Sequence, residues 1–385
     1  LHLSIRRQRQ MCIRDRIIIM IDGGRWDRAV NSKFFQSLKS NSVCLLQPIT
    51  YAPHTIAAMH AVFSGTYGAR TGTNSYWATY KFKKEKFLTL TEYLHTQNYY
   101  TCADIVNRLV IPKQGFDEFN LHDELQDDLT AKHVGYIKRM KEKNEKGQNF
   151  FLYLQYSHIH TGIMNEVLKV YDNFSTEYFE NITKNEKRYD ELFKTSETYL
   201  EQILKTINEL QLEQNSIILV MSDHGISVGE KLGERAYGAF CYDYTLRTFA
   251  YFMFPDISSM EIPQQVRTID YMPTILDYLK ISFESDFSKI DGESLLPLFN
   301  NVKVPEKFAY SETGNPLQNK APPKEPNMFS IRSSSWKLIY NAHNNTRELY
   351  DLKIDPLEKN NLVGNNSEIE EMLWQELLKI KNQES

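Results

Sequence analysis

The sequence predicts an α/β protein, with a mostly parallel β-sheet flanked by helices and a small antiparallel α+β subdomain at the C-terminal end. Two observations support this fold class. Short runs of β-branched and aromatic residues alternate with longer segments whose apolar residues recur at helical spacing, which is the pattern of a parallel sheet. The 385 residues are also enough to bury one large core with a smaller unit beside it.

Four apolar runs are predicted to be strands of the parallel sheet. They cover residues 17–21, 43–49, 150–156 and 217–221. A helix is expected over residues 57–63, entered from the turn at Ala52 and Pro53. A longer helix leads into the last strand, because apolar residues recur there at helical spacing, namely Tyr199, Leu200, Ile203, Leu204, Ile207 and Leu210.

The amino-acid composition of the chain changes near residue 301. Residues 315–326 are rich in Pro, Asn and Lys and are predicted to form a loop. Two short strands and a closing helix are expected after it, over residues 335–340, 347–352 and 369–380. We therefore expect a main α/β domain over residues 17–300 and a C-terminal subdomain over residues 301–385.

Composition argues against several classes of protein. The formal net charge of −4 argues against a nucleic-acid partner, which would favour a basic chain. The four cysteines are far apart and form no CxxC pair, which excludes a dense disulfide scaffold and a zinc ribbon. No apolar run approaches the roughly 20 residues that span a bilayer, so no membrane span is expected.

Residues 1–16, LHLSIRRQRQMCIRDR, differ from the rest of the chain. They are basic throughout and lack the apolar centre of a signal peptide. They resemble a translated sequencing-adapter artefact, so we expect a non-native leader here and a native N-terminus that is missing. The sequence therefore leaves the cellular compartment open.

Residues suited to chemistry follow all four predicted strands. They are Asp22 after the first strand, Thr55 at the helix start after the second, His158 and His160 after the third, and Asp223 and His224 after the fourth. Ligands of open parallel sheets bind at the carboxyl ends of the strands, which share one edge of the sheet. We therefore expect these side chains to converge on one site.

The residue types in this group favour metal-assisted ester chemistry. Asp22, Asp223 and His224 supply oxygen and nitrogen ligands for one divalent ion, for which zinc, manganese and calcium are the candidates. A metal lowers the pKa of an alcohol, so Thr55 is a candidate nucleophile. The start of a helix also favours an anion, and His160 is a candidate general acid for the departing oxygen.

Each of these residues also has a simpler structural explanation. Thr55 taken alone is more often the N-cap of its helix than a nucleophile. Asp22 and the segment Asp223-His224-Gly can be plain turn residues. His158 is equally well explained as a hydrogen-bonded residue near a surface loop. In combination these explanations are weaker, because every one of these residues would need its structural explanation to be correct at the same time.

Several segments, in order along the chain, resemble the sulfatase-like family of the alkaline phosphatase superfamily. They include IIIMIDGGRWD, APHTIAAMHAVFSGTYGARTG, GFDEF, FFLYLQYSHIH, MSDHG, YDYTLRT, IDYMPTILDYL, IDGESLLPLF and WKLIYN. The resemblance implies an alkaline-phosphatase-like fold and a periplasmic or extracellular location. It also implies that Asp22, Asp223 and His224 are metal ligands, that Thr55 is both ligand and nucleophile, and that His160 is the family histidine.

Two further positions are interpreted through the same resemblance. Arg70 falls near a basic position of the nucleophile segment, which makes it a candidate for substrate binding, with a plain surface arginine as an equal alternative. His158 stands where family members commonly carry an aspartate, and it is the second candidate for substrate binding.

Departures from the family pattern bear on the substrate and the metal. Conversion to formylglycine needs a cysteine or serine in a Cys-x-Pro-x-Arg type of motif, whereas residues 55–59 are TIAAM. Gly23 replaces the second family aspartate, Val106 or Asn107 stands nearest to the usual lysine, and Tyr237 replaces a histidine or lysine. These losses remove anion-binding cations and favour one metal ion rather than two.

We therefore expect a metal-dependent hydrolase or transferase that acts on phosphate esters or diesters through a covalent Thr55 intermediate. The first alternative is hydrolysis of sulfate esters with an unmodified Thr55. The second alternative is a catalytically inactive member that keeps the fold as a binding or scaffold protein. The expected substrate is a small molecule or a glycan- or lipid-linked ester.

Overall fold

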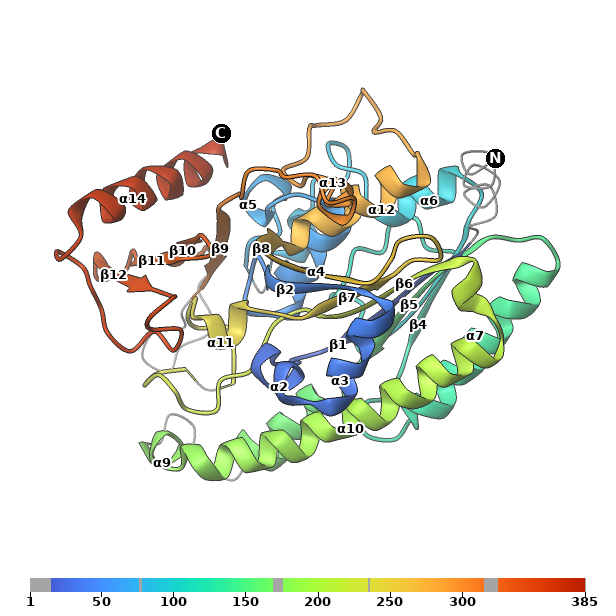
Figure 1. Ribbon diagram of the computed structural model, residues 1–385, viewed down its shortest axis with the longest axis horizontal. Coiled ribbons are helices and arrows are strands. Elements are labelled where there is room, and N and C mark those ends of the chain that lie inside the picture. Colours follow the sequence, from blue (N-terminus) through green and yellow to red (C-terminus); the bar gives the residue numbers. More distant parts are fainter. Residues whose placement is uncertain (1–14, 76–77, 169–175, 235, 315–324, 385) are drawn as a thin grey trace.

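The computed structural model describes residues 15–75, 78–168, 176–234, 236–314 and 325–384. Eight strands form a central sheet in the order β4-β3-β5-β1-β6-β7-β2-β8 (Figure 1). Their bounds are β1 Asp15–Ile21, β2 Val43–Ile49, β3 Tyr100–Ile105, β4 Glu118–Leu121, β5 Phe150–Tyr156, β6 Ser216–Ser222, β7 Ala250–Met253 and β8 Met260–Arg267. Neighbouring strands are parallel, except that β7 runs antiparallel to both β6 and β2.

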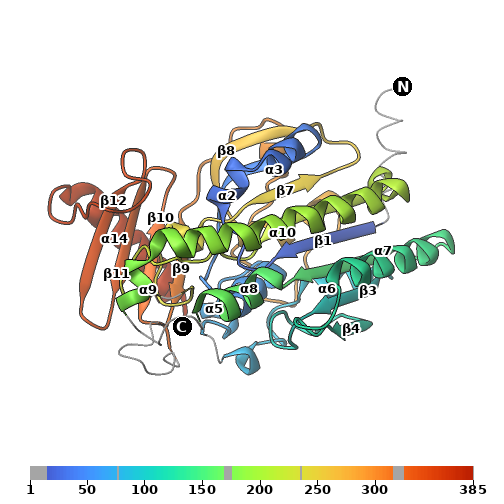
Figure 2. The same cartoon turned by 90° about the horizontal axis from the view of Figure 1, so that it is seen from below.

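Helices cover both faces of this sheet (Figures 1 and 2). One face carries α2 Trp26–Asn31, α3 Lys33–Leu38, α7 Leu129–Glu145, α8 His158–Gly162 and α10 Ile182–Glu209, and the other carries α4 Thr55–Ser64, α6 Leu90–Thr96, α12 Tyr271–Leu279 and α13 Leu296–Phe299. Side chains of a strand alternate between its faces. In β1, Ile17, Ile19 and Ile21 therefore enter one core, and Ile18 and Met20 enter the other.

The predicted strands and helices of the main sheet are confirmed, with small shifts at their ends. β2 and β5 have the predicted bounds. β6 extends one residue beyond the predicted strand at each end, and β1 begins at Asp15, two residues before the predicted start. The predicted helix 57–63 lies within α4, and the second predicted helix is the last part of α10. Residues 1–14 of the predicted leader and residues 315–324 of the predicted loop lie outside the described residues.

A small antiparallel sheet follows, as predicted, in the order β12-β11-β10-β9. Its strands and the helix packed on it are β9 Ala309–Thr313, β10 Met328–Arg332, β11 Trp336–Asn341, β12 Thr346–Asp351 and α14 Ser367–Lys381. Leu373 of α14, Leu338 of β11 and Ala61 of α4 share one core, so this sheet packs against the helix that begins at Thr55. The domain boundary at residue 300 stays a prediction.

The remaining short helices connect these parts. They are α5 Gly68–Thr71, α9 Thr176–Glu180 and α11 Asp243–Leu246. Across the described ranges, no helix is both long and apolar enough to cross a bilayer.

A buried ionic network joins the two sheets. Asp243, at the start of α11, contacts Arg332 of β10 at 2.9 Å and Lys337 of β11 at 2.8 Å, and Lys337 also contacts Glu358 at 2.8 Å. Burial alone would raise the pKa of Asp243, but the two cations hold it well below its usual value. A fully buried ammonium such as that of Lys337 requires carboxylates beside it. Arg332 also donates from Nη1 to Oε1 of Gln265 in β8 at 2.6 Å, so the network links the antiparallel sheet to the main sheet.

Asp243→Asn tests this network. Removing the negative charge leaves Arg332 and Lys337 buried without their shared partner, so we expect the free energy of unfolding to fall by about 3–5 kcal/mol. Urea unfolding followed by circular dichroism measures the change. Glu209→Gln, which removes only an exposed pair with Lys205, is the control and should cost less than about 1 kcal/mol. Equal effects of the two substitutions would contradict the role of the network.

Candidate active site

The residues that follow β1, β2, β5 and β6 lie together at the carboxyl edge of the central sheet. β5, β1 and β6 are parallel neighbours, so the positions just past their ends are close in space. Thr55 Oγ1 lies 3.4 Å from Asp22 Oδ1 and 3.2 Å from His224 Nε2. His160 Nδ1 lies 3.6 Å from Asp22 Oδ1. The structure thus brings these four residues together with Asp223.

Thr55 is the first residue of α4. His54 holds the N-cap position, so the interpretation of Thr55 as the N-cap is wrong. The Thr55 hydroxyl instead faces Asp22 and His224, and the residue is 7% exposed. The first N–H groups of a helix have no partner within it, which makes the start of α4 favourable for a negatively charged group beside Thr55.

Asp22 is held by a buried amide that the sequence analysis did not identify. Gln155 of β5 donates from Nε2 to Asp22 Oδ2 at 2.7 Å, and its Oε1 accepts the backbone N–H of Val106 at 3.1 Å. Gln155 is completely buried, so both ends of its amide need partners and its orientation is fixed. The only signal in the sequence is one polar residue within the apolar run FFLYLQY.

Asp223 and His224 are oriented by the backbone around them. Asp223 Oδ1 accepts the N–H groups of Gly23 at 3.1 Å and His224 at 2.9 Å. His224 Nδ1 lies 2.8 Å from the carbonyl oxygen of Gly225, which can only accept, so Nδ1 carries the proton. The lone pair of His224 Nε2 therefore faces Thr55 and the two carboxylates, as a metal ligand requires.

Burial and neighbouring charges shift the pKa values of the two carboxyl groups of the site in opposite directions. Burial raises the pKa of Asp223 to about 6, and the nearby Asp22 carboxylate adds to the effect. Burial alone would also raise the pKa of Asp22, but the positive charge and hydrogen bond of His160 lower it. Two buried carboxylates with opposite shifts form a centre that attracts positive charge.

The geometry of Asp22, Asp223 and His224 fits a divalent cation. Their ligand atoms lie within 4.8 Å of one another, and all three residues are buried. His224 Nε2 is 3.8 Å from Asp22 Oδ1 and 3.4 Å from Asp223 Oδ2. Ligands around a tetrahedral ion with bonds of about 2.0–2.1 Å are separated by roughly 3.3 Å. Asp223 Oδ2 is buried without a hydrogen-bond partner at ordinary bonding geometry among the described residues, with the Thr55 hydroxyl as its nearest donor, and a cation would satisfy that oxygen.

The backbone at Gly23 leaves no room for a further carboxylate ligand. Gly23 has a φ of +73°, and a Cβ placed there would lie 2.9 Å from Cδ1 of Ile226. An aspartate at this position would need both a strained backbone and a shift of Ile226. Glycine therefore suits this position better than aspartate, and the expectation of one metal ion stays a prediction.

His160 stands at the exposed side of the cluster, with about a quarter of its side chain accessible. Tyr237, which replaces a basic family residue, places its hydroxyl 3.3 Å from His160 Nδ1 and its ring 4.9 Å from that of His224. Burial alone would lower the pKa of His160, but Asp22 raises it to about 9. His160 is therefore protonated at neutral pH and faces the space above Asp22.

The two predicted substrate-binding residues make contacts outside the cluster around Thr55. Arg70 pairs with Asp291 at 2.5 Å and donates to the carbonyl oxygen of Lys289 at 2.8 Å. His158 is exposed, and its ring lies 5.9 Å from that of Tyr156. Within the described part of the chain, no hydrogen bond or ion pair joins either residue to the cluster around Thr55. Their roles in substrate binding stay predictions.

Comparison with family models gives two matches that together cover nearly all of the described chain. Residues 15–281 match the model described as Sulfatase. Residues 236–383 match the model described as N-sulphoglucosamine sulphohydrolase, C-terminal.

Curated relatives are similar over part of their length. Choline-sulfatase of Rhizobium meliloti is 26% identical over 197 residues, which are 51% of this chain and 36% of that protein. Arylsulfatase K of Mus musculus is 27% identical over 222 residues, which are 54% of this chain and 38% of that protein. The match thus spans less than two-fifths of the length of these relatives.

Solved structures share the fold over nearly the whole chain. A protein solved in complex with its substrate D-glucosamine-2-N,6-O-disulfate has a TM-score of 0.74 and 17% identity, with 96% of this chain and 98% of that chain covered. The phosphonate monoester hydrolase of Agrobacterium radiobacter has a TM-score of 0.71 and 13% identity, with coverages of 97% and 96%. These neighbours confirm the predicted fold class.

Asp223→Asn tests the proposed metal ligands. The amide keeps the shape of the carboxyl group but loses its charge, so we expect affinity for Zn²⁺, Mn²⁺ or Ca²⁺ to fall at least about 100-fold. Isothermal titration calorimetry of the three ions measures the change. Asp286→Asn, at an exposed position, is the matched control and should bind as the wild type does. Unchanged affinity in Asp223→Asn would exclude Asp223 as a ligand.

Proposed function

The chain belongs to the sulfatase family, and we propose that it hydrolyses an ester of a tetrahedral oxyanion, with phosphate esters and diesters as its substrates. The observation that carries this proposal is the position of Thr55. Its hydroxyl lies within 3.4 Å of both Asp22 and His224, at the start of α4 where an anion is favoured. An alcohol held by two metal-ligand side chains is the arrangement expected of an activated nucleophile.

In the proposed reaction, Thr55 Oγ1 attacks phosphorus after its proton has been released to water. A divalent ion held by Asp22, Asp223 and His224 would lower the pKa of this hydroxyl and balance the charge on the phosphoryl oxygens. The bond to the leaving oxygen breaks as His160 donates its proton to that oxygen. Water then attacks the Thr55-bound phosphate and gives one proton to His160. The bond from Thr55 to phosphorus breaks, and Thr55 Oγ1 takes back from water the proton that it released at the start.

The identity of the nucleophile is the reason to place phosphate before sulfate. Sulfatases that use formylglycine release sulfate through an aldehyde hydrate, and an unmodified threonine cannot form that hydrate. A threonine ester of phosphate is resolved by direct attack of water at phosphorus. Thr55 therefore suits phosphoryl transfer better than sulfuryl transfer.

Sulfate-ester hydrolysis is the second candidate, because the names of the relatives favour it. The matched curated proteins include a choline-sulfatase and an arylsulfatase, and one structural neighbour was solved with a disulfated glucosamine as its substrate. A sulfate monoester and a phosphodiester are both tetrahedral monoanions, so one site can bind either. The two candidates differ in whether Thr55 can complete turnover.

Thr55→Ala separates catalysis from binding. We expect loss of the nucleophile to lower kcat for an aryl phosphate or phosphodiester at least about 10³-fold, while the metal ligands remain in place. Release of the aryl alcohol, with matched phosphate, phosphodiester and sulfate esters and added Zn²⁺, Mn²⁺ or Ca²⁺, measures turnover. Thr206→Ala, a buried helical threonine outside the site, is the control.

The three esters distinguish the hypotheses. Cleavage of phosphate or phosphodiester that disappears in Thr55→Ala supports the proposal. Cleavage of the sulfate ester alone would establish the second candidate. Absence of all three activities together with absence of metal binding would favour a scaffold protein.

The pH dependence of turnover tests His160. Asp22 raises the pKa of His160 from 6.5 to about 9, against the effect of burial, and a bound cation would offset the charge of Asp22 and draw that pKa back down. The acid acts in its protonated form, so kcat should fall as the pH rises through an apparent pKa between 6.5 and 9. His160→Gln should remove this alkaline limb. The same limb in both proteins would assign the acid to another residue.

A further inference from the structure

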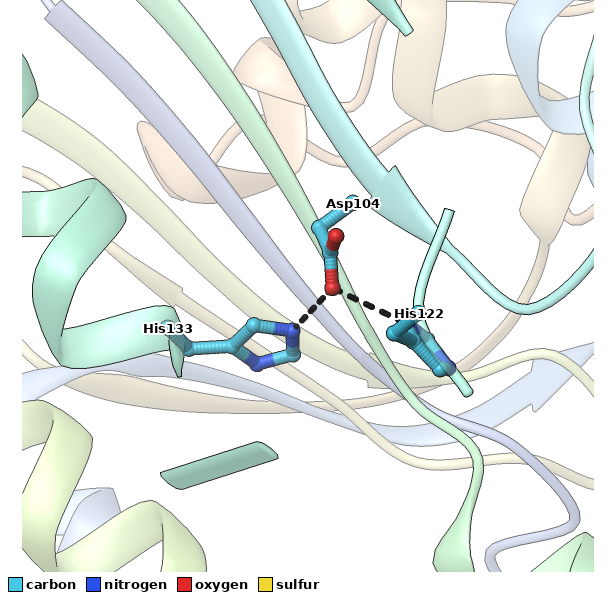
Figure 3. A group of neighbouring side chains, drawn as sticks. All are labelled: Asp104, His122 and His133. Atoms are coloured by element: carbon cyan, nitrogen blue, oxygen red, sulfur yellow. Dashed lines mark hydrogen bonds and ion pairs between the residues drawn. The ribbon is translucent and has the colours of Figure 1, made fainter. Parts of the chain in front are cut away.

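A second group of metal-ligating residue types is buried in the described part of the chain and consists of Asp104, His122 and His133 (Figure 3). Asp104 lies near the end of β3, His122 directly follows β4, and His133 belongs to α7. His122 Nδ1 and His133 Nε2 reach the same oxygen, Asp104 Oδ2, at 2.8 and 3.0 Å. The far ring nitrogens also have partners, because His122 Nε2 lies 2.8 Å from Ser157 Oγ and His133 Nδ1 lies 2.7 Å from the hydroxyl of Tyr199.

The spacing of this group indicates direct hydrogen bonds rather than a metal site. Distances of 2.8 and 3.0 Å from nitrogen to oxygen are ordinary hydrogen bonds. They are shorter than the roughly 3.3 Å between ligands of a tetrahedral zinc ion. Lys132 also places its ammonium 3.6 Å from Asp104 Oδ1, where it would repel a divalent cation. The candidate ligand atoms of Asp22, Asp223 and His224 are instead 3.4 and 3.8 Å apart, which is wider than a direct hydrogen bond.

The hydrogen bonds of this group converge on Asp104 from two sides. Burial would raise the pKa of Asp104, but the hydrogen bonds from His122 and His133 hold it well below its usual value, so the group is a carboxylate. A carboxylate only accepts, and both rings must therefore present an N–H to it. Burial lowers the pKa of His133, so its ring is neutral and its far nitrogen accepts from the Tyr199 hydroxyl. A neutral His122 ring accepts in the same way from the Ser157 hydroxyl.

One arm of this hydrogen-bond network reaches the helix that carries His160. Ser157 immediately precedes α8, and at the other end of α8 Thr161 Oγ1 donates to Glu124 Oε2 at 2.7 Å. His122 and Glu124 belong to the same short segment after β4, so residues 122–124 hold α8 at both ends. Through His122 and Asp104 that segment is joined to α7 and α10.

The helix needs such contacts because it is very short. α8 has five residues and continues directly into a π-helical segment over Ile163–Leu168, so the helical stretch has 11 residues in all. This is still fewer than the roughly 12–15 at which an isolated helix becomes even marginally stable in water. Its position must therefore come from tertiary contacts. His160 is its third residue, and displacing a proton donor by about 1 Å can lower a rate about 100-fold.

We propose that residues 122–124, anchored by Asp104 and His133, form a clamp on α8 that positions His160 over Asp22. His122, Glu124, Ser157 and Thr161 are positioning residues, since they reach the reaction only through His160. The proposal rests on the proposed function for the role of His160 as proton donor. The clamp itself is a structural statement that can be measured without turnover.

Ser157→Ala tests one end of the clamp. Loss of its hydroxyl should lower kcat roughly 10-fold with KM within about twofold, and should make the α8 amides exchange with deuterium roughly 10-fold faster. Ser196→Ala is the matched control, because Ser196 is equally buried and donates only to Phe193 of its own helix. Wild-type kcat and exchange rates in Ser157→Ala would overturn the proposal.

Thr161 tests the other end with a conservative pair. Thr161→Val keeps the shape of the side chain and removes its hydroxyl, whereas Thr161→Ser keeps the hydroxyl. We expect the same loss of kcat and faster exchange in the valine variant and recovery of both in the serine variant. Equal behaviour of the two variants would overturn the role of the Glu124 contact.

Two further outcomes separate this proposal from its alternatives. Metal analysis of purified His122→Phe and His133→Phe should show the wild-type metal content, and loss of one ion in both would replace the clamp with a second metal site. An inactive wild-type protein would count against the proposed function alone. The exchange rates of α8 in Ser157→Ala and Ser196→Ala would then still decide whether the clamp exists.

Discussion

The constraint on which the rest of the site depends is the burial of two carboxylates side by side. Asp22 and Asp223 follow the neighbouring strands β1 and β6, and each is at most 1% exposed. Two like charges away from water repel each other strongly, so they persist only with donors and positive charge around them. Gln155, two backbone N–H groups and the imidazole of His160 supply part of this. A divalent cation would supply the rest, and the orientation of His224 suits it.

The strands that position the site could be predicted because their apolar composition identifies them. β1, β5 and β6 are buried at every residue, and their apolar runs end where the site begins. β3 and β4 have the sequences YTCADI and EFNL, in which polar residues interrupt the pattern. These strands exist because β5 offers an open edge for pairing, which is a tertiary effect that local propensity does not contain.

The same limit explains which site residues the sequence analysis missed. The rule that chemistry follows strand ends found Asp22, Asp223 and His224, and it would have found His122 had β4 been recognised. Gln155 lies within a strand, and its function depends on which neighbouring strand its amide faces. Tyr237 was found only through the family resemblance, and its contact with His160 could not be predicted because spacing along the chain says nothing about that distance. Residues of this kind act through three-dimensional contacts, so only the fold reveals them.

The balance of charge in the site bears on the kind of ester it favours. Among the described residues, no lysine or arginine forms an ion pair with Asp22 or Asp223, and Tyr237 supplies a neutral hydroxyl where the family pattern has a cation. A phosphate monoester brings two negative charges near neutral pH, whereas a phosphodiester or a sulfate ester brings one. A bound divalent ion would offset the two carboxylates, which leaves protonated His160 as the positive charge for the substrate. One positive charge matches a monoanion, so within the proposed phosphoryl chemistry this site suits a diester better than a monoester.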